Sequence, residues 1–207
     1  MFKKNKYTII RQAIPKDLTT FVANYFMMKK QVYDTCSKTR FISPFETLLG
    51  EYEGVNNQIP GTYSHYSDIA METLMLRCQP LMEKATKLKL YPAYTYARIY
   101  KKGDVLKRHK DRYSCEVSMT MSLGGDPWPI YLEPSGETDK EGVKVDLEPG
   151  DALIYRGCEV EHWREAFEGE DCGQVFLHYN NAKTKGAKDN IYDGRPHVGL
   201  PSWFRGK

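Results

Sequence analysis

The sequence predicts an α+β fold in which a jelly roll of short strands carries N-terminal helices packed on one face. Three features of the 207 residues indicate this fold class. Helix-like apolar periodicity is confined to the first part of the chain, short strands with Gly and Pro turns fill the second part, and no internal repeat or low-complexity linker divides them. We therefore expect a single domain, with a helical N-terminal part over residues 1–90, a jelly-roll core over 91–181 and a C-terminal tail over 182–207.

The N-terminal part begins with the segment YTIIRQAIP, which reads as a strand. An apolar stripe then predicts a helix from about Leu18 to Val32, and residues 36–64 carry the Ser, Pro, Gly and Asn expected of a long loop. Ser67-Asp68 precedes a second apolar stripe and would cap a helix over residues 69–87. Its methionines suit the filling of a core.

From Tyr91 onward, alternating segments separated by turn residues predict about eight short strands. Such a series of strands at regular spacing is typical of a sandwich or barrel. The expected strands are 93–100, 114–123, 129–134, two within 143–155 that break at Pro149-Gly150, and a closing pair, 159–167 and 174–180, around the turn 168–173.

Composition favours a soluble intracellular protein, which we expect to be cytoplasmic. The formal net charge of +3 gives no argument for binding to nucleic acid or to a membrane. The five cysteines are odd in number and form no CxxC pair, as expected of reduced thiols. The basic N-terminus MFKKNKYTIIRQ is not followed by the apolar stretch of a signal peptide, and no run of residues is apolar enough to span a membrane.

The chemically informative motif is His109-Lys110-Asp111, which follows a strand in KGDVLKRHKDRYS. In extended backbone, residues i and i+2 project from the same face, so an imidazole and a carboxylate would point at one place. His162, on the expected strand EVEHWRE, can add a third ligand. Two histidines and one carboxylate leave coordination positions open for O2 and a cosubstrate, whereas a structural zinc site is closed by four protein ligands. We predict that His109, Asp111 and His162 bind Fe(II) and form the catalytic centre.

A His-x-Asp pair alone is a weak signal, because a surface histidine beside a solvated aspartate gives the same pattern. The context favours a metal site over that reading. The pair follows a strand, the turn and strand PGDALIYRG precede His162, and all three residues lie in the expected jelly roll.

These motifs resemble a known family. Tyr100-Lys-Lys-Gly103, His109-Lys-Asp111, Gly150-Asp151-Ala-Leu-Ile-Tyr155 and His162 are similar to the prolyl-4-hydroxylase-like branch of the iron(II)/2-oxoglutarate-dependent dioxygenases, over about residues 90–181. The resemblance implies a cupin-like double-stranded β-helix, Fe(II), 2-oxoglutarate as cosubstrate and O2, and it leaves room for ascorbate. It also implies a hydroxylase that couples decarboxylation of 2-oxoglutarate to succinate with hydroxylation of a C–H bond.

The cosubstrate site departs from the family pattern. The family has a Lys or Arg about ten residues after the second histidine, but Cys172 stands there in this sequence. Arg164 is the nearest cation and shares a strand face with His162, so we expect it to grip the distal carboxylate of 2-oxoglutarate, with Gln174 as a neutral helper. A surface ion pair of Arg164 with Glu161 or Glu165 is the alternative. By resemblance, Tyr100 and Tyr131 would also contact the cosubstrate, although each could instead be a packed core aromatic.

Arg98, Tyr113 and Trp163 are candidate substrate contacts, since each is close in sequence to a ligand or to Tyr100. The expected substrate is a protein or peptide side chain, with peptidyl proline as the first choice, or a small amino-acid-like molecule. Three alternatives stay open. They are an AlkB-type nucleic-acid demethylase, a cupin-type metal protein that does not use 2-oxoglutarate, and a non-enzymatic jelly-roll binding module.

Overall fold

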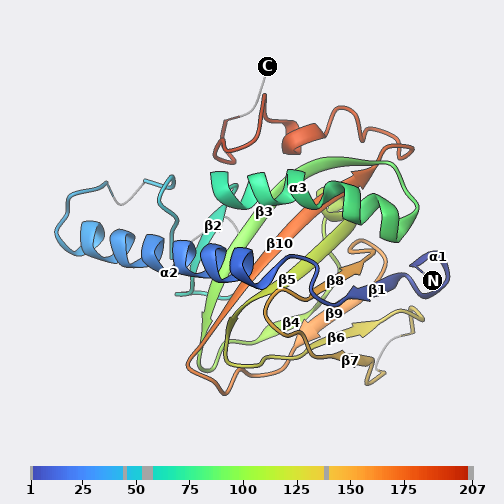
Figure 1. The fold of residues 1–207 in the computed structure, drawn as a ribbon, viewed down its shortest axis with the longest axis horizontal. Coiled ribbons are helices and arrows are strands. Elements are labelled where there is room, and N and C mark those ends of the chain that lie inside the picture. Colours follow the sequence, from blue (N-terminus) through green and yellow to red (C-terminus); the bar gives the residue numbers. More distant parts are fainter. Residues whose placement is uncertain (1, 44–45, 53–57, 138–139, 205–207) are drawn as a thin grey trace.

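Two antiparallel sheets enclose the interior of the protein in the computed structural model, which describes residues 2–43, 46–52, 58–137 and 140–204 (Figure 1). The larger sheet has six strands, in the order β1 (Tyr7–Ile10), β8 (Ala152–Tyr155), β5 (Val117–Gly125), β10 (Asp171–Asn181), β3 (Leu90–Lys101) and β2 (Tyr63–Tyr66). The smaller sheet has four, in the order β4 (Leu106–His109), β9 (Glu161–Arg164), β6 (Ile130–Glu133) and β7 (Val143–Val145).

The chain passes repeatedly from one sheet to the other between β3 and β10. The first passage is made by the turn Lys102-Gly103-Asp104, where Gly103 adopts a φ of 85° that favours glycine. The carboxylate of Asp104 accepts hydrogen bonds from the Lys101 amide at 2.9 Å and the Thr62 hydroxyl at 2.8 Å, which fixes the turn. This winding is a double-stranded β-helix, and the predicted fold class is confirmed.

Helices α2 (Lys16–Lys38) and α3 (Ile69–Thr86) lie against the outer face of the larger sheet (Figure 1). One hydrophobic cluster joins Phe26 of α2 and Met75 of α3 to Met119 and Leu177 of the sheet. The remaining helices are short: α1 (Phe2–Asn5), η1 (Tyr113–Cys115) and η2 (Ile191–Gly194). Asp68 caps α3 by accepting a hydrogen bond from the Met71 amide at 3.0 Å, as the sequence predicted.

Two expectations about strands were wrong. Residues 36–64 are not all loop, because α2 extends to Lys38 and β2 begins at Tyr63. The strands around His162 and Gln174 do not form a closing pair either. β9 pairs with β4 and β6, and β10 pairs with β3 and β5, so the turn between them crosses from the smaller sheet to the larger.

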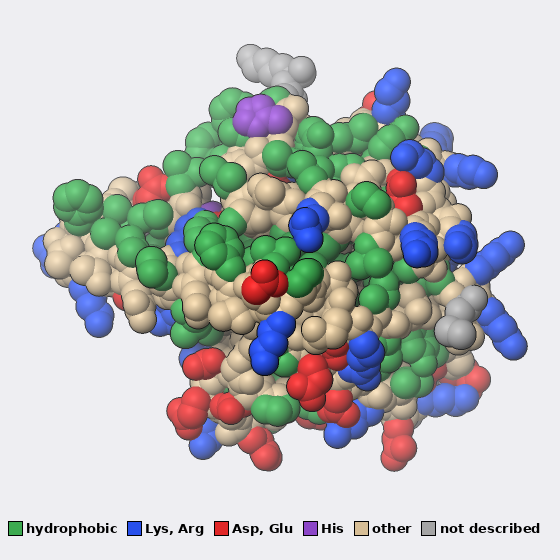
Figure 2. Space-filling view, in the orientation of Figure 1, with side chains coloured by type: hydrophobic (Ala, Val, Ile, Leu, Met, Phe, Trp, Pro, Cys, Tyr) green, Lys and Arg blue, Asp and Glu red, His purple; other side chains and the backbone are tan. Residues whose placement is uncertain are grey.

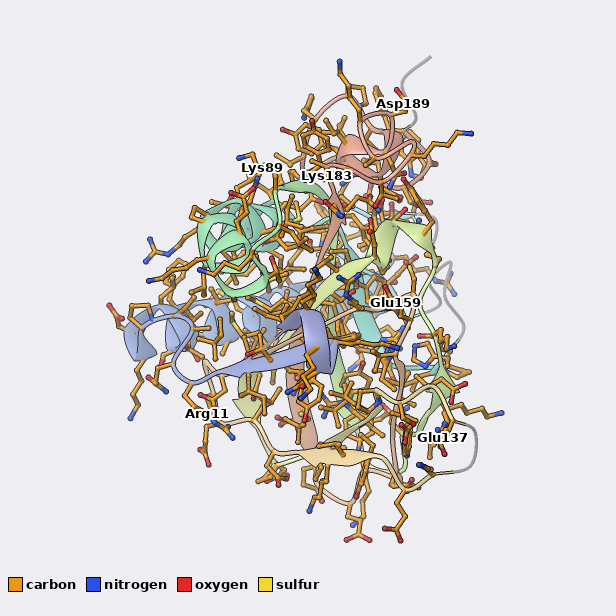
Figure 3. All side chains as sticks on the ribbon, turned by 90° about the vertical axis from the view of Figure 1, so that its right-hand side faces the viewer. Arg11, Lys89, Glu137, Glu159, Lys183 and Asp189 are labelled. Atoms are coloured by element: carbon orange, nitrogen blue, oxygen red, sulfur yellow. The ribbon has the colours of Figure 1, made fainter. Side chains whose placement is uncertain are left out.

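The outer surface mixes charged and apolar side chains. Figure 2 shows hydrophobic side chains along α2, where Phe21, Met28 and Val32 are exposed. Figure 3 shows the tail after β10, marked by Lys183 and Asp189, at one end of the molecule, and Glu137 toward the other. No helix in the described ranges has the length and apolar character needed to cross a lipid bilayer.

Candidate metal centre

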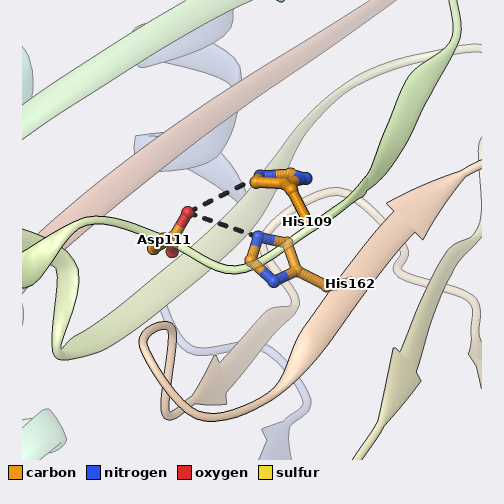
Figure 4. A group of neighbouring side chains, drawn as sticks. All are labelled: His109, Asp111 and His162. Atoms are coloured by element: carbon orange, nitrogen blue, oxygen red, sulfur yellow. Dashed lines mark ion pairs between the residues drawn. The ribbon is translucent and has the colours of Figure 1, made fainter. Parts of the chain in front are cut away.

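The side chains of His109, Asp111 and His162 converge at one point (Figure 4). His109 ends β4 and lies directly across from His162 on β9, with 4.3 Å between the centroids of the two rings. Oδ1 of Asp111 is 3.6 Å from Nε2 of His109 and 3.4 Å from Nε2 of His162. All three ligand atoms lie within 4.8 Å of one another, so one metal ion can contact all of them.

Both histidines present the nitrogen that a metal needs. Nδ1 of His109 is 2.7 Å from the carbonyl oxygen of Lys107, and Nδ1 of His162 is 3.0 Å from that of Val160. Because a carbonyl oxygen only accepts, each Nδ1 carries the hydrogen and each Nε2 keeps its lone pair toward Asp111. This pattern is typical of metal-binding histidines.

Asp111 is held in its ionised form. Burial alone would raise the pKa of its carboxyl, but without a metal ion the His162 and His109 imidazoles that carry a proton on Nε2 outweigh that effect and hold the pKa well below its usual range. Its second oxygen, Oδ2, lies 3.3 Å from the hydroxyl of Ser118, which is itself 2.9 Å from Nδ1 of His178. The Asp111 amide donates to the carbonyl of Gly157 at 2.9 Å. A Cβ atom on Gly157 would overlap Oδ2 of Asp111 and the carbonyl oxygen of Cys115, so this position requires glycine.

Arg164 lies inside the barrel on β9, two residues after His162, and only 1% of its surface is exposed. Its guanidinium lies over the ring of Trp128 and donates from Nη1 to the carbonyl of that residue. Its Nε and Nη2 have no hydrogen-bond partner among the described residues. The alternative interpretation, a surface ion pair with a neighbouring glutamate, is therefore wrong, since Glu161 pairs with Arg108 and the Arg164 side chain is enclosed.

Two of the other residues expected at the cosubstrate share this interior. Tyr100 is buried on β3 and lines the cavity at the metal centre. Gln174 is buried on β10, where its Nε2 lies 3.2 Å from Sγ of Cys172. Burial lowers the pKa of the Arg164 guanidinium, and the neighbouring Tyr100 and Cys172 side chains oppose that change in part.

Tyr131 does not belong to this group, and the expectation that it binds the cosubstrate was wrong. It pairs with Trp163 across β6 and β9, and the two rings stack with centroids 5.5 Å apart. Both side chains line a groove on the outer face of the smaller sheet, because successive residues of a strand point to opposite faces and His162 points inward.

Some of the candidate substrate contacts line the cavity inside the barrel, and others lie outside it. Arg98 lines the cavity, with its guanidinium over the rings of Tyr96 and Tyr100 at 5.0 and 5.7 Å. Trp163 lies on the outer face and does not line the cavity. Tyr113 does not line it either, since 43% of its surface is exposed and its hydroxyl donates to the carbonyl of Lys185 in the tail.

The cavity at the metal centre has a volume of about 250 Å³. It contacts all three candidate ligands and is enclosed largely by aromatic rings, with Arg98, Lys110 and Arg112 as its cations. Sequence reasoning missed Gly157 and Ser118, which support Asp111. Neither carries a recognisable motif, because their roles depend on the approach of strands that lie far apart in the sequence.

Comparison of the sequence with protein-family models and with curated proteins gives no match. Solved structures do match. A Pseudomonas putida prolyl-4-hydroxylase shares 16% identity at a TM-score of 0.59, covering 87% of this chain and 95% of that one. The α-ketoglutarate-dependent epimerase SnoN of nogalamycin biosynthesis shares 13% at a TM-score of 0.64, covering 87% and 80%. HygX of Streptomyces hygroscopicus, solved with nickel, 2-oxoglutarate and hygromycin B, shares 12% at a TM-score of 0.57, covering 93% of each chain.

The chain therefore has the fold of the iron/2-oxoglutarate-dependent oxygenases, and the resemblance seen in the sequence is confirmed at the level of the fold. These structures belong to proteins with different reactions and substrates. The fold alone therefore identifies neither the reaction nor the substrate of this chain.

Proposed function

We propose that this protein is an Fe(II)/2-oxoglutarate-dependent oxygenase that hydroxylates a C–H bond of a peptidyl proline or another amino-acid side chain. The observation that carries the proposal is that one barrel holds both a two-histidine, one-carboxylate cluster and a buried guanidinium with unsatisfied nitrogens. The first group suits a metal ion with open coordination positions, and the second suits an anion.

His109, Asp111 and His162 would hold the iron. Bound iron supplies the activation of O2, and the protein has to position the reactants around it. The two Nδ1–H groups bonded to backbone carbonyls keep the imidazoles oriented, and Ser118 orients the carboxylate.

Arg164 would bind the distal carboxylate of 2-oxoglutarate. A buried arginine without an anion is costly, and a bidentate carboxylate would satisfy the nitrogens that the protein leaves unbonded. Tyr100 and Cys172 are neighbours of this guanidinium, and Gln174 contacts Cys172. The family's usual cation is replaced here by Cys172 on β10, and the arginine comes instead from β9 in the smaller sheet.

The size of the cavity supports a side chain as the reacting group. Ligand pockets typically measure about 300–1,000 Å³. A cavity of about 250 Å³ that must also accept a cosubstrate has room for one small group, while the remainder of the substrate stays outside. A protein side chain that protrudes into the cavity fits this arrangement.

Anaerobic addition of Fe(II) and 2-oxoglutarate should give a visible charge-transfer band, and Asp111→Ala should abolish it.

Arg164→Met, which keeps side-chain volume and removes the charge, should weaken 2-oxoglutarate binding by about 100-fold while sparing the metal, because charged hydrogen bonds are worth about 1.5–3 kcal/mol each. Arg108→Met is the matched control, since Arg108 lies on the outer face over Trp163. Wild-type 2-oxoglutarate affinity in Arg164→Met would exclude this arginine as the anchor.

Formation of succinate distinguishes the substrate classes. Proline-containing peptides should stimulate the conversion of 2-oxoglutarate to succinate and gain one oxygen atom by mass spectrometry. Stimulation by free amino acids but by no peptide would contradict the assignment to a peptidyl side chain.

A further inference from the structure

The C-terminal tail, residues 182–204, is anchored on the outside of the barrel close to α3 and the end of β10 (Figure 1). Arg195 of the tail forms a fully buried ion pair with Glu72 of α3, at 2.7 Å. The amide of Gly199 also donates to the Glu72 carboxylate. The tail is therefore a fixed part of the molecule at this point.

Asp193 is the tail residue that pairs with Arg112, the neighbour of Asp111 in the chain. Only 1% of its surface is exposed, and its carboxylate accepts from both terminal nitrogens of Arg112, at 2.8 and 2.9 Å, from Ser114 at 2.6 Å and from Tyr66 at 2.7 Å. Asp193 and the preceding Tyr192 both have left-handed φ values, 57° and 54°. Two consecutive non-glycine residues in this region are unusual and require the surrounding contacts to hold them.

Arg112 directly follows the metal ligand Asp111 in the chain. Its guanidinium lies over the ring of Tyr94 at 4.5 Å, and both residues line the cavity that contains the candidate ligands. Among the described residues that line this cavity, Asp111 is the only acidic one. Without the contact to Asp193, the half-exposed guanidinium of Arg112 could turn to solvent or to Asp111, which is the acidic residue of the cavity lining and a ligand that the metal requires.

We infer that Asp193 sequesters the guanidinium of Arg112 and so keeps Asp111 available to the metal ion. The inference rests on the iron site of the proposed function. It gives the tail a defined role, because the tail supplies Arg112 with a carboxylate other than Asp111, the acidic residue among the described residues that line the cavity. Asp193 is in this sense a positioning residue, and it acts through Arg112.

Cobalt(II) is a suitable probe, because its absorption spectrum reports binding without turnover. Asp193→Asn keeps the size of the side chain but removes its charge, and it should raise the Kd for Co²⁺ about tenfold or more, as loss of groups that support metal ligands does. Adding Arg112→Gln to Asp193→Asn should restore the wild-type Kd, because the competing cation is gone. Tyr66→Phe is the matched control, since it removes one hydrogen bond to Asp193 and leaves the ion pair intact.

Arg112→Gln alone keeps the test independent of how well Asp193→Asn folds. It should bind Co²⁺ with wild-type affinity. Weakened Co²⁺ binding in this variant would overturn the inference, because it would mean that the Arg112–Asp193 ion pair supports the structure of the metal centre. A wild-type Kd in Asp193→Asn, or a double variant as weak as Asp193→Asn, would overturn it as well. Absence of Co²⁺ binding in the wild type would instead refute the metal site itself, and with it this inference.

Discussion

At the scale of single residues, the candidate metal centre depends on small groups as much as on the three candidate ligands. Asp111 can turn toward the histidines only because Gly157 has no side chain to obstruct Oδ2. The hydroxyl of Ser118 then donates to that oxygen at 3.3 Å. The geometry of the ligands is therefore set by residues that have no metal-binding chemistry of their own.

Gly157→Ala should disrupt the metal centre without unfolding the barrel. The added methyl group would overlap Asp111 and the carbonyl of Cys115, so we expect the Kd for Co²⁺ to rise by roughly 100-fold, the upper range for loss of ligand support. The measurement is a Co²⁺ titration followed by absorption, with thermal unfolding to verify the fold. Gly173→Ala is the matched control, since its Cβ would make only ordinary contacts with Leu123 and Gly124. Equal affinities in the two variants would contradict this role of Gly157.

The convergence of His109 and Asp111, two of the three candidate ligands, could be predicted from the sequence because their spacing places both side chains on one face of extended backbone. Tyr131 shows what spacing alone does not encode. Its face depends on which residue of β9 lies opposite, and it lies opposite Trp163 instead of His162. The outward direction of Trp163 itself was accessible from the sequence, because neighbouring residues of a strand alternate and His162 had to point inward.

At the scale of secondary-structure elements, local signals located most helices and strands but did not assign strands to sheets. The cap at Asp68 marked the start of α3 because the capping interaction is formed within four residues. β2 was missed because YSHY lacks the apolar alternation of a half-buried strand, and it is stabilised by pairing with β3 at the edge of the sheet. The partners of β9 and β10 depend on contacts between distant segments, which a local pattern does not contain.

Asp68→Ala should destabilise the protein strongly, because two roles are lost at once. Asp68 caps α3 through the Met71 amide, and it pairs with Lys29, whose side chain is only 12% exposed. Loss of a cap costs about 1 kcal/mol, and a buried cation left unpaired costs about 3–5 kcal/mol. Urea denaturation should therefore show a loss of several kcal/mol. Asp17→Ala, in the exposed first turn of α2, is the control, and we expect a change within about 0.5 kcal/mol. Similar losses in the two variants would argue against the paired role of Asp68.

At the scale of the whole molecule, the ends of the chain complete the barrel. β1 forms the edge of the larger sheet by pairing with β8, about 145 residues later in the chain. The tail closes the other side through Glu72 and Arg112. Electrostatic contacts at these junctions should consequently influence the stability of the entire fold.

Stability should fall steeply in acid, and Asp193 should account for part of the loss. Burial alone would raise the pKa of Asp193, but hydrogen bonds from Arg112, Ser114 and Tyr66 outweigh it and lower the pKa from 3.8 to about 2. A lowered pKa stabilises the folded state above about pH 4, and this contribution, roughly 2 kcal/mol, disappears as the pH falls toward 2. Urea midpoints measured from pH 6 to 2 should thus decline less in Asp193→Asn than in the wild type. Parallel declines would show that Asp193 does not contribute.

His162 and Arg164 lie two residues apart on one short strand, so the geometry of the strand sets the distance between the candidate metal ligand and the proposed carboxylate anchor. Two residues of a strand span about 6.6 Å, and this span separates the attachment points of the metal ligand and the proposed carboxylate anchor. A dicarboxylate must bridge them, so the four-carbon oxaloacetate should be too short and the six-carbon 2-oxoadipate too long. Competition with 2-oxoglutarate should show weaker binding of both, and equal binding of all three would mean that the chain does not select by length. In this barrel, the choice of a five-carbon acid would follow from the pitch of a β-strand and not from a dedicated specificity pocket.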